Sequence, residues 1–140
     1  MSDQAGFSAT YRHCIPWSTL RIEGVGTSGG IPEIEIPEID FSESLFAFNG
    51  GCLTLAVAPA EVEVEIRVSA EGPPPGQAVI FTGVLAVPDG VLEVGDLVAD
   101  DFVHRFRVPA GATEIVVSVD VPEEAVRVGI TVPAILGDLL

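Results

Sequence analysis

Lysine is absent from the 140-residue chain, and basic residues of any kind are few. All six basic side chains are arginines, whereas 21 residues are aspartate or glutamate, so the formal net charge is −15 at pH 7. Proteins that bind nucleic acid or anionic membranes use Lys and Arg to neutralise phosphate, and this composition argues against both classes of partner. We therefore expect any charged partner to be basic.

Long apolar runs are also absent, although hydrophobic residues make up 48% of the chain and the mean hydropathy is +0.49. No run approaches the roughly 20 residues that a membrane-spanning helix needs. The apolar residues are therefore expected to fill a core or a contact surface. The residues after Met1 lack the basic and apolar regions of a secretory signal, which predicts a cytoplasmic protein.

Cysteine is scarce, with only Cys14 and Cys52 present. In an intracellular protein two such residues are expected to be free thiols, whereas in an exported protein they would be able to form one disulfide. A domain of this length does not depend on that bond, because it buries a large core of its own.

Helical periodicity is missing, and alternation with a period of two residues takes its place. It is clearest over residues 61–68, where Val or Ile alternates with Glu or Arg. Further strands are expected over 7–12, 19–25, 43–48, 52–57, 78–87, 90–97, 102–108, 115–119 and 126–132. Residues 122–125 suit either one helical turn or a bend between strands.

Turns rich in Gly, Pro, Asn and Asp separate these short segments, a pattern typical of antiparallel sandwiches. We predict an all-β protein, an antiparallel two-sheet β-sandwich of about nine or ten short strands. Residues 1–140 are expected to form one domain.

The segment 29–42 is the exception to the alternating pattern, because it holds a local repeat of Ile-Pro-Glu-Ile over residues 31–40. Proline lacks the amide proton that a central strand donates, so we expect an extended Pro/Glu-rich loop or an edge segment. Its prolines and charges either protect a sheet edge from aggregation or present carboxylates to a partner.

No group of residues points to catalysis. His13 and Cys14 are neighbours, but successive strand residues point to opposite faces, so the two side chains are not expected to meet. His104 alternates with phenylalanines and is expected at the edge of the core. The glutamates at 61, 63 and 65 share one solvated strand face. We expect no catalytic residue and no enzyme activity.

Metal and cofactor motifs are missing as well. The two cysteines and two histidines lack the paired spacing of a zinc site. Asp96, Asp100 and Asp101 cluster as calcium ligands do, but no EF-hand loop surrounds them, and a solvated loop is expected. The pattern G-x-G-x-x-G over residues 24–29 precedes an Ile-Pro segment rather than a helix, which argues against a phosphate site. We expect neither a metal nor a cofactor.

Four segments carry a family resemblance: 44–55 (SLFAFNGGCLTL), 77–81 (QAVIF), 84–94 (VLAVPDGVLEV) and 106–116 (FRVPAGATEIV). Together they cover roughly residues 44–120 and resemble the ComJ family of competence-associated nuclease inhibitors. The last segment is similar to that family's arrangement of a strand, a Pro-x-Gly turn and a further strand. The resemblance implies a small intracellular protein that binds and silences a nuclease or toxin-like enzyme.

The acidic charge points independently to an inhibitor or immunity protein, since a nuclease presents a basic cleft to phosphate. The contacts expected with that basic partner are six carboxylates: Glu33, Glu35, Glu38, Asp40, Asp100 and Asp101. An acidic surface also keeps an apolar protein soluble without any partner. The alternative function is a self-associating structural or accessory module, a homo-oligomer whose apolar residues cover a subunit interface.

Overall fold

The computed structural model describes residues 7–15, 18–24, 46–48, 51–59, 61–96, 102–122 and 124–138. These residues form eleven β-strands and no α-helix. The strands are β1 (Ser8–Cys14), β2 (Thr19–Gly24), β3 (Phe46–Phe48), β4 (Cys52–Ala56), β5 (Glu63–Ser69), β6 (Ala78–Val87), β7 (Val91–Asp96), β8 (Val103–Arg107), β9 (Gly111–Val119), β10 (Arg127–Thr131) and β11 (Gly137–Asp138). The first ten overlap the segments expected from alternation, and β11 has only two residues.

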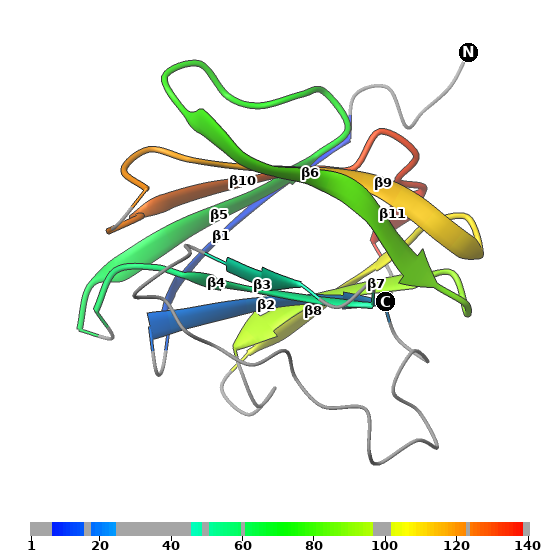
Figure 1. The fold of residues 1–140 in the computed structure, drawn as a ribbon, viewed down its shortest axis with the longest axis horizontal. Helices are drawn as coiled ribbons and strands as arrows, with labels where there is room; N and C mark the ends of the chain where they lie inside the picture. The colour runs from blue at the N-terminus through cyan, green and yellow to red at the C-terminus, as the bar shows by residue number, and fades with distance from the viewer. Residues whose placement is uncertain are drawn as a thin grey trace.

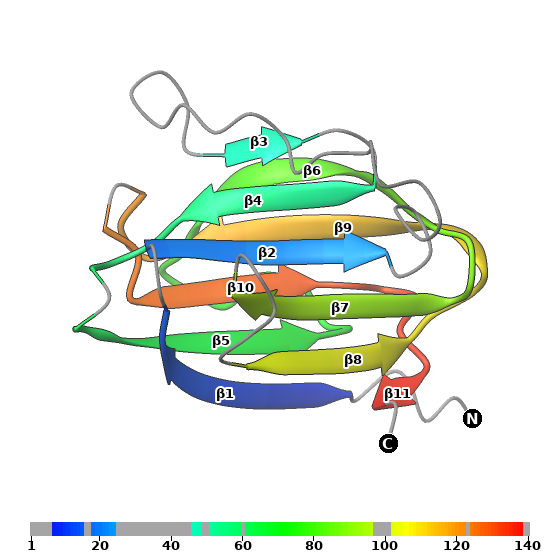
Figure 2. The same ribbon diagram turned by 90° about the horizontal axis from the view of Figure 1, so that it is seen from below.

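The strands form two stacked sheets (Figures 1 and 2). One sheet has the order β1-β5-β10-β9-β6, and the other has the order β11-β8-β7-β2-β4-β3. The predicted all-β sandwich is therefore confirmed. Its strands pair antiparallel except for β10, which runs parallel to β5. No hairpin joins these two strands, so no short turn fixes their relative direction.

Strand β5 follows the alternation that the sequence predicts. Val64, Ile66 and Val68 are fully buried, while Glu63 is exposed at the start of the strand. Val62 was expected on the buried side but is 37% exposed, because it precedes the first residue of β5. Alternation therefore predicts burial correctly for apolar residues inside the strand. It does not do so for Val62, which lies just before the first strand residue.

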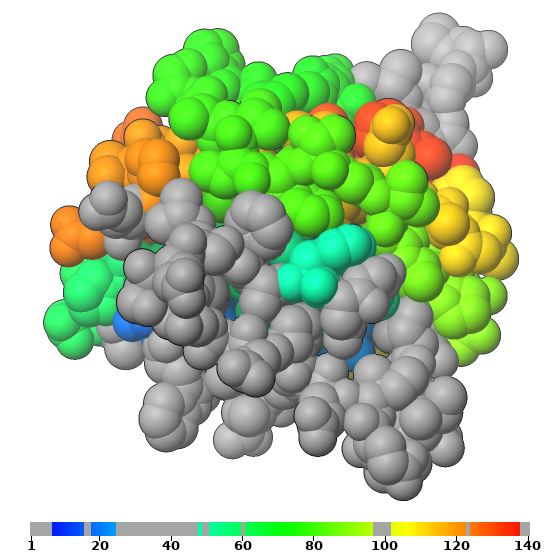
Figure 3. Space-filling model, viewed as in Figure 1, coloured from blue at the N-terminus to red at the C-terminus, as the bar shows by residue number. Residues whose placement is uncertain are grey.

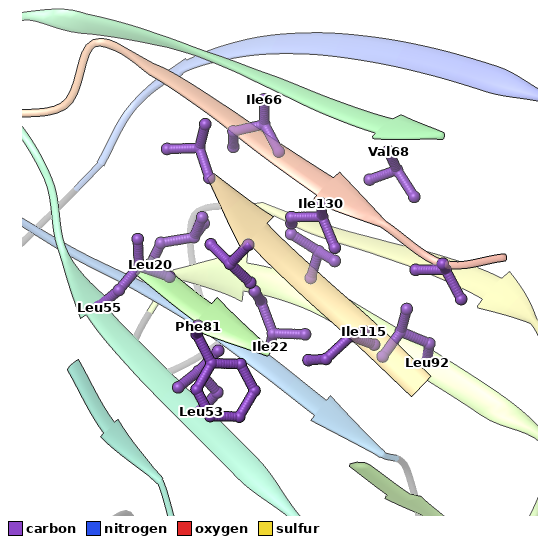
Figure 4. Packing of buried hydrophobic residues seen from close by; sticks show 14 of the residues in the cluster. Leu20, Ile22, Leu53, Leu55, Ile66, Val68, Phe81, Leu92, Ile115 and Ile130 are labelled. Atoms are coloured by element: carbon purple, nitrogen blue, oxygen red, sulfur yellow. The ribbon is translucent and has the colours of Figure 1, made fainter. Parts of the chain in front are cut away.

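The core fills the space between the sheets (Figure 4). Leu20, Ile22 and Leu53 from one sheet pack toward Ile115 and Ile130 from the other, and all five are 0% exposed. Full burial of such a side chain contributes about 1.5–3 kcal/mol. The described strands therefore share one apolar core.

The two sheets come very close where β2 ends. A Cβ atom at Gly24 would lie 1.8 Å from the carbonyl oxygen of Ala86 in β6, which is closer than any side chain tolerates. Gly90 is required for a different reason. The turn between β6 and β7 needs a φ of 73° at this position, and glycine adopts that positive angle without strain.

Asp120 shapes the connection after β9. The carboxylate oxygen Oδ1 of Asp120 accepts hydrogen bonds from the backbone amides of Val121, Val126 and Arg127 at 2.8–3.1 Å. The amide of Glu124 donates to the carbonyl oxygen of Val121 at 3.1 Å. One aspartate thus organises the turn that leads into β10.

Three sequence features lie wholly or partly outside the described residues. They are the segment 29–42, the G-x-G-x-x-G pattern beyond Gly24, and the aspartates at 100 and 101. Within the described part of the chain, no helix is long and apolar enough to cross a membrane.

Candidate functional site

All six carboxylates expected to contact a basic partner lie outside the residues that the structure describes. They are Glu33, Glu35, Glu38, Asp40, Asp100 and Asp101. Asp96, which the sequence grouped with the last two in a solvated loop, is 1% exposed. Its Oδ1 accepts a hydrogen bond from the amide of Phe102 at 3.3 Å. The expectation of a solvated side chain was therefore wrong for Asp96, because it closes the β7–β8 connection instead.

A cluster of four charges crosses the six-stranded sheet, and we call it the Arg21 cluster: Arg21, Glu23, Glu93 and Arg105. Arg21 Nη1 lies 2.5 Å from Glu23 Oε1, and Arg21 Nη2 lies 2.7 Å from Glu93 Oε1. The second contact is ionic, since the N–H is not directed at the oxygen. Arg105 Nε donates to the second oxygen of Glu93 at 2.8 Å. The cluster balances two cations against two anions.

The register of the sheet brings this cluster together. Glu23 of β2 lies opposite Glu93 of β7, and Glu93 lies opposite Arg105 of β8. Two glutamates facing each other repel, and Arg21, two residues before Glu23, reaches both of them. Arg21 is 3% exposed and Glu93 is 7% exposed, so both charges are buried. The sequence missed the cluster because pairing of β2 with β7 joins residues about 70 positions apart.

The cluster controls the protonation of Glu93. Burial by itself raises the pKa of this carboxyl group, but the hydrogen bond from Arg105 and the nearby charges of Arg21 and Arg105 outweigh burial and hold the pKa below the ordinary value for glutamate. Glu93 is therefore ionised at neutral pH. A carboxylate satisfied in this way stabilises the sheet and is poorly suited to proton transfer.

Both cysteines are free, and their surroundings differ. Burial and the charge of Glu23 raise the pKa of the Cys52 thiol to about 12, against the opposing effect of Arg21. Cys52 is therefore a protonated, unreactive core thiol. Cys14 is exposed on β1, and its neighbour His13 points to the opposite side, as alternation predicted.

His13 and His104 form a pair between the two sheets. Their Nε2 atoms are 2.8 Å apart, so one ring donates a hydrogen bond to the other. His13 stacks on Phe102 with ring centres 4.0 Å apart, and His104 stacks on Tyr11 at 3.6 Å. The sequence placed His104 correctly beside the core but missed its contact with His13, since the two residues lie on different sheets.

The glutamates expected on one solvated strand face lie on β5 or just before it. The glutamate at position 65 is held by Arg12, with 3.1 Å between Nη2 and Oε1. Within the described ranges, no three His, Cys, Asp or Glu residues are grouped so as to hold a metal ion.

No protein-family model and no curated protein matches the chain. Among solved structures it is similar to ComJ, the inhibitor of the DNA degrading activity of NucA, from Bacillus subtilis. The two share 14% sequence identity with a TM-score of 0.59, and the match covers 91% of this chain and 96% of ComJ. This similarity extends over nearly the whole of both proteins, and the ComJ-like fold implied by segments 44–55, 77–81, 84–94 and 106–116 is therefore confirmed.

Proposed function

We propose that this protein is a non-catalytic inhibitor that binds a basic nuclease, or a toxin-like enzyme with a basic cleft, and occludes that cleft. The observation that carries the proposal is the likeness in fold to ComJ over 91% of the chain. The net charge of −15 supports it, because carboxylates attract the Lys and Arg residues with which nucleases bind phosphate.

The described arginines leave the negative charge largely uncompensated. Arg21 and Arg105 are engaged within the Arg21 cluster, and Arg12 pairs with Glu65. Glutamates and aspartates elsewhere on the described surface are exposed, and they outnumber the three remaining arginines. The net field around the protein is therefore negative, which accelerates encounter with a basic partner and repels DNA.

The proposed contacts are those expected from the sequence: Glu33, Glu35, Glu38, Asp40, Asp100 and Asp101. Four of them fall in one stretch of eight residues, so one acidic segment is able to enter a cleft that normally holds a phosphate backbone. Binding of this kind weakens with salt, because charges are screened beyond about 10 Å at 0.1 M ionic strength.

The function is tested by adding the purified protein to basic proteins of its source cell, separated by cation exchange, and measuring DNA degradation. We expect one or more fractions to lose nuclease activity, with an inhibition constant that rises steeply with salt. If no fraction is inhibited, or if inhibition is indifferent to salt, the proposal is wrong.

The contact residues are tested with two variants of equal charge change. One neutralises Glu33, Glu35, Glu38 and Asp40 to their amides. The control neutralises four exposed glutamates on the described surface: Glu61, Glu63, Glu71 and Glu114. The first variant is expected to lose inhibition at least about tenfold more than the control, because close pairs contribute more than long-range charge. Equal losses would show that only the overall charge matters.

A second candidate function, self-association, is favoured by strand β6. It is the end strand of its sheet, its ten residues carry no charge, and Val79 and Val84 are 52% and 57% exposed. Figure 3 shows β6 atoms at the molecular surface. Unprotected edge strands pair readily with other strands, and an antiparallel pairing of β6 with itself satisfies two-fold symmetry without bringing charges together.

Sedimentation of the purified chain separates the two candidates. Self-association predicts a dimer that Val84→Lys converts to a monomer, while Val121→Lys, at a 50% exposed site outside β6, leaves the dimer unchanged. A monomer at all concentrations removes the second candidate.

A further inference from the structure

The histidine pair offers a site that the proposed function does not use. We propose that His13 and His104 bind a divalent transition-metal ion through their Nε2 atoms, with Cu²⁺ or Ni²⁺ preferred to Zn²⁺. Imidazole nitrogen is the most common protein ligand for such ions. Both side chains are only partly buried, so an ion reaches them from solvent.

The spacing of the two nitrogens selects the coordination geometry. They are 2.8 Å apart. An ion about 2.05 Å from each would subtend an angle of about 86° between them. This is close to the 90° between neighbouring ligands in the square-planar and octahedral arrangements of Cu²⁺ and Ni²⁺. A tetrahedral Zn²⁺ needs its nitrogen ligands about 3.3 Å apart, so it fits this pair less well.

Binding requires a rearrangement of hydrogens but no net loss of a proton. One ring now carries its hydrogen on Nε2 and donates it to the other ring. For both lone pairs to reach the ion, that hydrogen must move to Nδ1 of the same ring. Both neutral rings then present Nε2 to the metal, and no oxidant or additional base is involved.

The stacked aromatic rings limit how far the two ligands move. His13 lies nearly parallel to Phe102, with 7° between the ring planes, and His104 lies 18° from parallel to Tyr11. Binding requires each side chain to adjust χ1 and χ2 so that both Nε2 lone pairs meet at the ion, and each adjustment shifts or tilts a ring against its stacking partner.

The electrostatic surroundings favour a cation. The chain carries a net charge of −15, and the arginines next to the pair in sequence, Arg12 and Arg105, alternate to the opposite sides of their strands. Asp96 lies at the end of β7. Among the described carboxylates on the elements around the pair, it points to the same side of its sheet as His104. Water is expected to complete the coordination, because the described residues supply no third ligand.

Titration calorimetry with Ni²⁺ and electron paramagnetic resonance with Cu²⁺ test this site on the whole chain. A Cys14→Ser background removes the exposed thiol as a competing ligand. We expect one ion per chain and a Cu²⁺ spectrum split by two imidazole nitrogens. Loss of a residue that only hydrogen-bonds to a metal ligand weakens metal sites about 10–100-fold, so His104→Gln, which removes a ligand itself, is expected to weaken binding at least about tenfold.

Binding is also expected to weaken on acidification, because a protonated imidazole has no nitrogen lone pair to offer the ion. The nitrogen splitting is read from a chain with both histidines, so the test does not depend on the folding of His104→Gln. Absence of bound ion at millimolar metal, a spectrum with no imidazole nitrogen, or unchanged affinity in folded His104→Gln would each overturn the proposal. None of these outcomes bears on inhibition of a nuclease, and the two proposals are judged separately.

Discussion

Replacing Glu93 by glutamine tests whether the Arg21 cluster stabilises the sandwich. Glu93→Gln keeps the size of the side chain and removes the charge that faces both Arg21 and Arg105. The side chain of Arg21 is only 4% exposed, so water does not replace the lost partner. Glu65→Gln is the matched control, since Glu65 also pairs with an arginine from a neighbouring strand, but with Arg12 64% exposed.

The expected costs differ severalfold. Removing one partner of a buried ion pair costs about 3–5 kcal/mol, and we expect about 3 kcal/mol because Arg21 retains Glu23. Loss of the exposed pair in Glu65→Gln costs about 0–1 kcal/mol. Since small domains have a total free energy of unfolding of about 5–15 kcal/mol, Glu93→Gln is expected to remain folded.

Urea unfolding followed by far-ultraviolet circular dichroism measures the difference. With a slope of about 2 kcal/mol per molar urea, the midpoint of Glu93→Gln is expected to fall by about 1.5 M and that of Glu65→Gln by less than about 0.5 M. If the two variants shift equally, or if Glu93→Gln is as stable as the unaltered protein, the reasoning about the buried cluster is refuted.

The same variant has a pH signature. The pKa of Glu93 is lower in the folded protein than in the unfolded chain, so its stabilisation is complete above the unfolded-state pKa and is lost as the pH falls through the lower folded-state pKa. The difference in unfolding free energy between the unaltered protein and Glu93→Gln is therefore expected to shrink on acidification. Urea midpoints at pH 7, 5 and 3 check this, and a constant difference would contradict it.

Three further predictions follow from single contacts. In the native protein a thiol reagent is expected to modify exposed Cys14 quickly and buried Cys52, whose pKa is about 12, only after unfolding; rapid reaction of both would contradict this. Gly24→Ala places a Cβ against the carbonyl oxygen of Ala86 and is expected to cost about 1–3 kcal/mol or more, measured by the melting temperature; an unchanged melt would show that the sheets separate easily. Phe106→Ala removes a 0% exposed ring and is expected to lower the free energy of unfolding in urea by about 3–5 kcal/mol. A loss below about 1 kcal/mol would contradict the central place of this ring in the core.

Local pattern was enough to predict the strands and the fold class. Alternation identifies β5 and β10 because half of each strand faces a continuous core, and that requirement acts on every second residue. It does not specify which strands become neighbours. The parallel pairing of β5 with β10 joins segments about 60 residues apart, and nothing within either segment encodes it.

The candidate site was predicted less completely for the same reason. Arg21 and Glu93 belong to strands far apart in the sequence, and only the pairing of β2 with β7 brings them into contact. His13 and His104 belong to opposite sheets, so their contact depends on how the layers stack. Composition, in contrast, needs no register, and the negative charge that supports a basic partner was evident from the sequence alone.

The central claim is tested most directly by adding increasing amounts of the purified protein to an active nuclease that it inhibits. DNA degradation is measured at a nuclease concentration well above the dissociation constant. An inhibitor that occludes the cleft predicts that the rate falls in proportion to added protein, approaches zero at about one equivalent and does not change with longer preincubation. Nuclease that stays active at ten equivalents, or that is progressively inactivated by a small fraction of an equivalent, would contradict the account.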